Sequence, residues 1–124
     1  MVITEINEKN ERDAKSRNIL TLWDINNNQA ETDEDYVSGK VIDNALRIVF
    51  YLFYQPEIFK TCDNSIHMQY ETEDRSYLEF EVFENRVTCM IVPHREYDSA
   101  VFPEVSLDDI DQMNKVVGEF YGVK

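Results

Sequence analysis

Apolar residues recur at helical spacing in the segment that follows residue 38. From Gly39 to Phe53 the apolar side chains lie three and four positions apart, which places them on one face of a helix. Ser38 precedes this segment as a candidate N-cap, and Pro56 follows it, where helical geometry is disfavoured. The segment therefore predicts a core helix. Its apolar positions are Val41, Ile42, Ala45, Leu46, Val49, Phe50 and Phe53.

A second apolar stripe with helical spacing lies near the other end of the sequence. Ser106 and Asp109 have the spacing of a capping box, and Gly122 follows the last apolar position as a helix stop. We therefore expect a second amphipathic helix between these signals. Its stripe consists of Leu107, Ile110, Met113, Val117 and Phe120.

The section between the two helices has a period of two. Apolar and polar residues alternate over 66–70, 78–82 and 87–91, which is typical of strands that have one buried and one solvated face. Short polar connections predict an antiparallel meander, and Ala100–Phe102 is a candidate for a further edge strand. The sequence thus predicts an α+β fold: a two-layer sandwich with a meander of three to four strands and flanking helices.

The first 25 residues differ from the rest in having almost no apolar face. Residues 4–17 are nearly all polar, with acid-before-base pairs such as Glu11 and Lys15 that support a solvated helix. Only the turns around Ile19, Leu20 and Trp23 offer apolar contact. We expect residues 1–25 to form a loosely packed polar helix and residues 26–124 to form a single α+β domain.

Composition limits the classes of function. The 124 residues carry 25 acids and 12 bases, a net charge of −13, and 43% are hydrophobic. This composition is not that of a disordered chain, and no apolar run approaches the roughly 18 residues of a membrane span. The acidic field argues against direct binding of nucleic acid or anionic lipid. Residues 31–124 alone carry twenty acids and eight bases, so the acidity belongs to the predicted domain.

Cysteine usage and the start of the sequence indicate the compartment. Cys62 and Cys89 match no disulfide framework and no zinc or redox pattern, so we expect reduced thiols. Glu5, Glu8 and Glu11 interrupt the place where a secretory signal needs an apolar stretch. We therefore expect a cytoplasmic protein. The sequence has no glycine-rich phosphate loop and no nucleophile elbow, and we expect neither a cofactor nor a metal site.

The two histidines are candidates for acid–base chemistry. His67 lies on the polar face of a predicted strand, where Glu79 or Glu81 can face it across the ladder. His94 lies in a loop next to Arg95. A small enzyme or ligand-binding domain that uses His67 or His94 is therefore one alternative. An exposed strand histidine and a loop histidine without chemistry are the commoner arrangement.

Carboxylates gather in four places along the chain. The group at the start of the last predicted helix complements the helix dipole, which explains it without a function. The other three groups form either a solvated surface or a functional one, because like charges so concentrated oppose folding by repulsion. The four groups are Asp33, Glu34 and Asp35; Glu71, Glu73 and Asp74; Glu79 and Glu81; and Asp108, Asp109 and Asp111.

The end of the predicted core helix is rich in aromatic residues. Tyr51, Phe53 and Tyr54 make this end apolar around most of its circumference, which exceeds what one sheet covers. Such a stretch is more often part of a core than of an interface. A homodimer through Tyr51, Phe53 and Tyr54 is nevertheless an alternative.

The stretches VIDNALRIV, QPEIFKTCDNSIHMQYE and YLEFEVFENRV carry a resemblance. They resemble a family of small uncharacterised bacterial and mobile-element proteins, in which an amphipathic helix leads into a Pro-Glu-Ile segment and a strand. Where that family has an Asn-Trp-Asp-Gly stretch, this chain has INNNQAETDEDYVS. The resemblance implies the same order of helix and strands, and it gives no activity to transfer to this chain.

These observations favour a non-enzymatic protein whose acidic surface occupies the basic, nucleic-acid-binding site of a partner protein such as a nuclease. Phage and mobile-element inhibitors of host defence, including anti-CRISPR inhibitors, form one such class. An antitoxin or immunity protein that neutralises a toxin nuclease is an alternative. The expected contact residues are Glu71, Glu73, Asp74, Glu79 and Glu81, with Asp33, Glu34 and Asp35 as a second patch.

Overall fold

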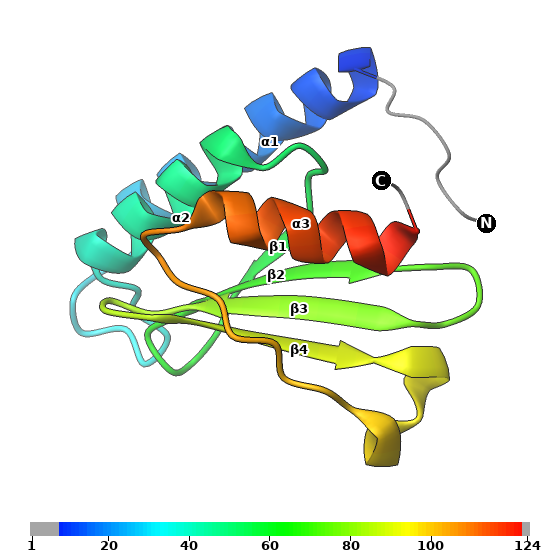
Figure 1. The fold of residues 1–124 in the computed structure, drawn as a ribbon. Coiled ribbons are helices and arrows are strands. Elements are labelled where there is room, and N and C mark those ends of the chain that lie inside the picture. Colours follow the sequence, from blue (N-terminus) through cyan, green and yellow to red (C-terminus); the bar gives the residue numbers. More distant parts are fainter. Residues whose placement is uncertain (1–7, 123–124) are drawn as a thin grey trace.

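The middle of the chain, where apolar and polar residues alternate, forms an antiparallel sheet with the strand order β1-β2-β3-β4 (Figure 1). The computed structural model describes residues 8–122. The strands are β1 (Glu57–Lys60), β2 (Ile66–Glu71), β3 (Tyr77–Val82) and β4 (Val87–Val92). The helices are α1 (Glu8–Asn27), α2 (Gly39–Tyr51) and α3 (Ile110–Tyr121), and two 3-10 turns, η1 (Pro93–Arg95) and η2 (Tyr97–Ser99), follow β4. The predicted α+β fold, with a meander and flanking helices, is confirmed.

The register of the sheet sends alternate side chains into one core. Met68 lies opposite Phe80, which lies opposite Cys89, and all three are at most 4% exposed. Cys89 therefore faces the helices, an orientation that the sequence alone does not establish. Burial raises the pKa of its thiol to about 12, so the thiol stays protonated and unreactive at neutral pH. Both cysteines are free, and Cys62 is exposed.

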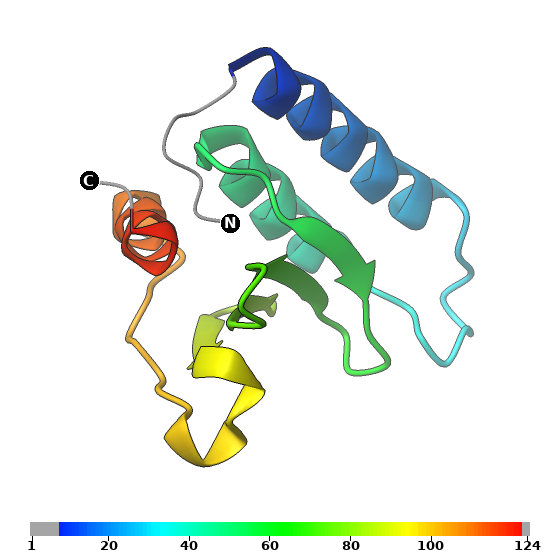
Figure 2. The ribbon, with the colours of Figure 1, turned by 90° about the vertical axis from the view of Figure 1, so that its right-hand side faces the viewer.

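All three helices lie on the same side of the sheet (Figure 2). Val41, Ala45 and Ile48 of α2 and Met113 and Val117 of α3 are completely buried against its inner face. Ser38 caps α2 as predicted, since its hydroxyl accepts from the Val41 amide. The outer face of the sheet is not covered by any helix of the described residues. No described helix is both long and apolar enough to cross a membrane.

Helix α1 contacts the rest of the fold further toward its start than its polar sequence predicts. Leu22 is completely buried, whereas Leu20 and Trp23, which the sequence suggested for apolar contact, are 57% and 54% exposed because they lie on the other side of the helix. In addition, the Glu11 carboxylate accepts from the Gln55 amide at 3.0 Å, and Lys15 donates to the Phe50 carbonyl at 2.8 Å. Lys15 thus bonds to the last turn of α2 and Glu11 to the segment that follows it, and they do not pair with each other. The first seven residues of the predicted helix, with Glu5, lie outside the described residues.

Two predicted elements differ in the structure. The additional strand is β1, a four-residue strand paired with β2, whereas Val101 makes only an isolated bridge to Ile91. Helix α3 begins at Ile110 with Asp109 as its N-cap, three residues later than a cap at Ser106 implies. The Ser106 hydroxyl instead accepts from the Asp108 amide in the preceding turn, at 3.1 Å.

A buried asparagine joins α3 to the end of α2. The Asn114 side chain is 8% exposed; its oxygen accepts from the Phe53 amide at 2.8 Å and its nitrogen donates to the Tyr51 carbonyl at 2.9 Å. These backbone groups belong to the C-terminal end of α2, where no further helical turn can satisfy them. Asn114 therefore replaces the missing turn and fixes the spacing of the two helices.

Replacing Asn114 should destabilise the fold. Asn114→Ala leaves a backbone donor and a backbone acceptor without their partner, and each unsatisfied buried group costs about 1–3 kcal/mol. We expect the free energy of unfolding to fall by about 2 kcal/mol or more in urea denaturation. Lys115→Ala, on the exposed side of the same helix, is the control and should change it by less than about 0.5 kcal/mol. Equal effects of the two variants would contradict the role of Asn114.

Candidate functional site

The eight predicted contact acids separate into three groups. Glu71, Glu73 and Asp74 lie at the turn between β2 and β3, whereas Asp33, Glu34 and Asp35 lie in the loop between α1 and α2, at the other end of the sheet (Figure 1). A six-residue strand spans about 20 Å, so these two groups do not form one surface. Glu79 and Glu81 lie between them on the outer face of β3.

The first group belongs to a composite loop that we call the tip: residues 71–76 together with η1. The two segments are joined because the His94 amide donates to the Ser76 hydroxyl at 3.2 Å, and the His94 Nδ1 atom lies 3.2 Å from the Asp74 carbonyl oxygen. The Thr72 amide also donates to the Ser76 carbonyl at 3.0 Å. The tip therefore has a defined shape although it is a loop.

The Asp74 carboxylate organises this turn. One of its oxygens accepts from the Thr72 hydroxyl and from the Ser76 amide, and the other lies 3.6 Å from His94 Nδ1. The hydrogen bonds from Thr72 and Ser76, with a smaller contribution from His94, lower the pKa of Asp74 to about 2. Asp74 is thus held ionised in one orientation while it remains exposed to solvent.

Three residues of the tip have left-handed backbone conformations that side chains rarely adopt. Arg75, His94 and Arg95 have φ of 69°, 51° and 60°. Each such conformation at a residue other than glycine costs of order 1 kcal/mol or more, and these costs are concentrated in two adjacent turns. Backbone strain of this kind gathers at binding and catalytic sites, so the tip is the strongest candidate for a functional surface.

Arg95 connects the tip to the outer face. Its guanidinium bonds to the Glu71 carboxylate through two nitrogens and lies 4.4 Å from the centre of the Tyr77 ring. It also donates to the Tyr97 hydroxyl at 3.3 Å, and the Tyr97 side chain is 61% exposed. The sequence pattern does not mark Arg95 or Tyr97 as contact residues, because only the folded structure brings them to the acids.

On the outer face, His67 faces two carboxylates as the strand pattern predicts. His67 Nε2 lies 3.4 Å from Glu81 Oε1 and 3.8 Å from Glu79 Oε2. The other oxygen of Glu81 accepts from the Ser65 hydroxyl at 2.7 Å, and the other oxygen of Glu79 accepts from the Tyr77 hydroxyl at 2.8 Å. The side chains of Glu79 and Glu81 are only 17% and 19% exposed.

The acids in the loop between α1 and α2 include two, Asp33 and Asp35, that make contacts with nearby residues. Asp33 accepts from the Ala30 amide at 2.8 Å and closes a turn, and Asp35 pairs with Lys60 at 3.2 Å. Both contacts are explained by the loop geometry and by the neighbouring strand. Ser38, at the end of this loop, donates to Glu84 at 2.8 Å. This end of the sheet is therefore acidic, but the carboxylates of Asp33 and Asp35 hold the loop in place.

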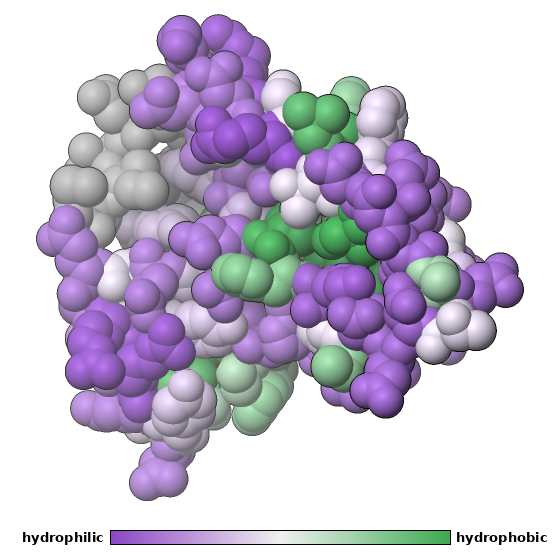
Figure 3. Space-filling model, turned by 180° about the vertical axis from the view of Figure 1, so that it is seen from behind, coloured by the Kyte–Doolittle hydropathy of each residue, from purple (hydrophilic) through white to green (hydrophobic). Residues whose placement is uncertain are grey.

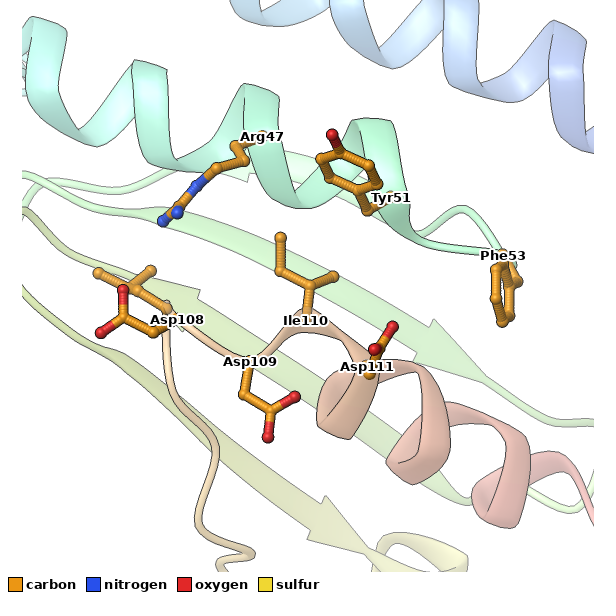
Figure 4. Close-up of a pocket in the computed structure, with 8 residues that line it drawn as sticks. Arg47, Tyr51, Phe53, Asp108, Asp109, Ile110 and Asp111 are labelled. Carbon is orange, nitrogen blue, oxygen red and sulfur yellow. The ribbon is translucent and has the colours of Figure 1, made fainter.

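A hollow of about 330 Å³ lies between α2 and the start of α3 (Figure 4). Arg47 extends into this region from α2 toward Asp108. Asp109 instead accepts from the Gln112 amide at 3.1 Å as the N-cap of α3, and Asp111 lies in the first helical turn. Asp109 and Asp111 are therefore explained by their positions at the start of a helix, as the sequence suggests. The polar groups do not converge on a point where a substrate atom could react.

The aromatic end of α2 is exposed only in part. Tyr51 and Phe53 are 57% and 62% exposed, as a homodimer surface requires. Tyr54, however, is 6% exposed and packs against Tyr121 with its ring centre 5.7 Å away. The expectation that Tyr54 contributes to a dimer surface is therefore wrong, because the chain turns inward after α2 and buries its ring. Phe50, at 55% exposed, lies beside Tyr51 instead.

No protein-family model, curated protein or solved structure matches this chain at a significant level. The resemblance of residues 41–81 to small bacterial and mobile-element proteins therefore stays a prediction. What this chain does has to be inferred from its own side chains.

The Asp74 carboxyl should titrate far below its usual value of 3.8, with a midpoint near pH 2 by NMR. Because the folded pKa lies below the unfolded one, ionised Asp74 stabilises the fold above about pH 4, and this contribution disappears as the pH falls through about 2. Thr72→Val removes the largest cause, so its Asp74 midpoint should move up toward 3.8. A midpoint near 3.8 in the unmodified chain would show that the turn is not held by this carboxylate.

Relieving the strain at Arg75 should stabilise the protein. Arg75→Gly places the residue that tolerates positive φ at this position, and we expect the free energy of unfolding to rise by about 0.5–1 kcal/mol relative to Arg75→Ala. The alanine variant is the matched control because it removes the same charge and keeps the Cβ atom. If glycine is no better than alanine in urea denaturation, the backbone at Arg75 is not strained.

Proposed function

We propose that the protein is a non-enzymatic interaction protein whose tip occupies a basic, nucleic-acid-binding site on a partner protein. The observation that carries this proposal is the tip itself, where exposed carboxylates are held in fixed positions by a strained backbone. Glu71 and Asp74 are 52% and 58% exposed and both have hydrogen-bonded orientations. Carboxylates fixed before binding lose little conformational entropy when they meet a cation.

The chemistry of the tip suits a protein partner rich in Lys and Arg. Residues 31–124 carry a net charge of −12, so their field attracts a basic surface over a distance and raises the association rate. Exposed Tyr97 and partly exposed Arg95 add the residue types that most often dominate interface energies. The channel of a nuclease or another nucleic-acid-handling enzyme has the complementary charge, because it binds phosphates.

Exposure decides which acids make contact. Glu71, Glu73 and Asp74 lie at the protruding end of the β2–β3 hairpin, whereas Glu79 and Glu81 are largely shielded by their own neighbours. In this proposal the tip acids touch the partner and the two face acids contribute to the field. Inhibitors of host defence from phages or mobile elements, and antitoxins against nucleases, both belong to this class of protein.

Several features favour a binding role over catalysis at His94. Its side chain is 59% exposed, and general acid–base catalysis works best where the site excludes water. The nearest carboxylate, that of Asp74, is engaged by Thr72 and Ser76 and so shapes the turn. His94 thus serves the tip as a positioning residue whose amide and ring join the two turns.

The test compares two variants with the same change in charge. The tip variant is Glu71→Gln/Glu73→Gln/Asp74→Asn, and the matched control is Asp33→Asn/Glu34→Gln/Asp35→Asn at the other end of the sheet. Each lowers the negative charge by three. The immobilised unmodified chain should retain nucleic-acid-binding proteins from a bacterial lysate at low salt, and added double-stranded DNA should displace them. The tip variant should retain about tenfold less of the same proteins, and the control should retain them as the unmodified chain does.

The dependence of partner binding on salt concentration shows whether the proposal fails. Binding dominated by exposed charges weakens steeply between low and physiological ionic strength, where the screening length falls to about 8 Å. Retention that does not depend on salt, or an equal loss in both variants, would contradict the proposal. Circular dichroism and thermal unfolding of both variants establish that the comparison is made between folded chains.

A further inference from the structure

We propose that His67, Glu79 and Glu81 form a binding site for one first-row divalent metal ion, such as Zn²⁺, on the outer face of the sheet. The three side chains come from adjacent strands, since His67 on β2 lies directly opposite Glu81 on β3 and Glu79 is two residues away on the same face. An imidazole nitrogen and two carboxylate oxygens are a donor set that zinc and its neighbours accept. The tip plays no part in this site.

The distances fit an ion among the three donors. Zinc bonds to nitrogen and oxygen are about 2.0–2.2 Å long, so neighbouring donors around a tetrahedral ion are about 3.4 Å apart. His67 Nε2 lies 3.4 Å from Glu81 Oε1 and 3.8 Å from Glu79 Oε2. The three donor atoms all lie within 4.8 Å of one another. Small rotations of the two glutamate side chains bring all three to bonding distance.

Hydroxyl groups already orient both carboxylates. Ser65, which is completely buried, donates to Glu81 Oε2, and the Tyr77 hydroxyl donates to Glu79 Oε1. In each glutamate the hydrogen-bonded oxygen points away from His67 and the other oxygen points toward it. Partners of this kind fix the ligands of natural metal sites and raise their affinity. The arrangement is therefore a built site, in contrast to acids that happen to be neighbours.

Charge and access also favour an ion here. Two carboxylates that are at most 19% exposed lie close together, and a dication between them offsets their mutual repulsion. Arg95 is engaged by Glu71 and lies over the Tyr77 ring. His67 is 32% exposed, which leaves the fourth position of the ion open to water.

His94 provides a comparison within the same chain. It faces a single carboxylate, that of Asp74, at 3.6 Å, and both side chains are more than half exposed. Among the described residues around His94 there is no second carboxylate, and there is no buried hydroxyl like that of Ser65, which orients Glu81 beside His67. His94 is therefore a matched control for nonspecific coordination by a histidine next to an acid.

The test is metal binding to the full chain without an affinity tag. Titration calorimetry with ZnCl₂ at neutral pH should give one ion per chain, and Co²⁺ should produce the visible absorption of a four-coordinate site. Zinc should also raise the Tm by several degrees, because it binds only the folded chain. His67→Ala should abolish these signals, and Glu79→Gln and Glu81→Gln should each weaken binding about tenfold or more.

The control variants decide between a specific site and adventitious coordination. His94→Ala should bind zinc as the unmodified chain does, and Ser65→Ala, which keeps all three ligands, should weaken binding by less than His67→Ala. If His67→Ala does not fold, His67→Gln keeps the size and polarity of the side chain and should show the same loss. The proposal is overturned if the unmodified chain binds no zinc at millimolar concentration, or if His94→Ala loses as much affinity as His67→Ala. His67 would then be only a cross-strand neighbour of Glu79 and Glu81.

Discussion

The register between β2 and β3 is the constraint on which the rest of this structure depends. It sets Met68 opposite Phe80 in the core and His67 opposite Glu81 on the other face. A slip of one residue would expose both core side chains, each of which contributes about 1.5–3 kcal/mol by burial, and would bury two ionisable groups. Because that exchange is so unfavourable, the positions of the polar outer side chains follow from the packing of the apolar ones.

The helices cover only one face of the sheet, and this makes the remaining surface mostly polar. The helices pack on the inner face, and the meander connects its strands by short turns, so the ends of the sheet and its outer face are left for polar residues (Figures 1 and 2). Viewed from behind, the molecule is mostly hydrophilic around a smaller apolar area (Figure 3). Strain in the backbone at Arg75, His94 and Arg95 is tolerated because the sheet and Asp74 hold both turns from either side.

The sequence was sufficient for the parts of the fold that depend on periodicity. Alternation predicted β2, β3 and β4, helical spacing predicted α2 and α3, and alternation also placed His67 beside Glu79 and Glu81. Periodicity could not predict β1, because four residues are too few to show a pattern and the pairing partner makes the strand. It could not identify Ser65 or Arg95 either, since their roles arise from partners distant in the chain, Glu81 and Glu71.

The acidity that dominates the composition acts differently at short and at long range. At short range many carboxylates have partners of their own, such as Lys60 for Asp35 and Arg95 for Glu71, so local repulsion is reduced. At longer range the field is screened within about 8 Å at physiological salt, which is less than half the length of β3. The tip and the opposite end of the sheet therefore act as separate acidic surfaces. An ion at His67 would lower the charge of the outer face between them.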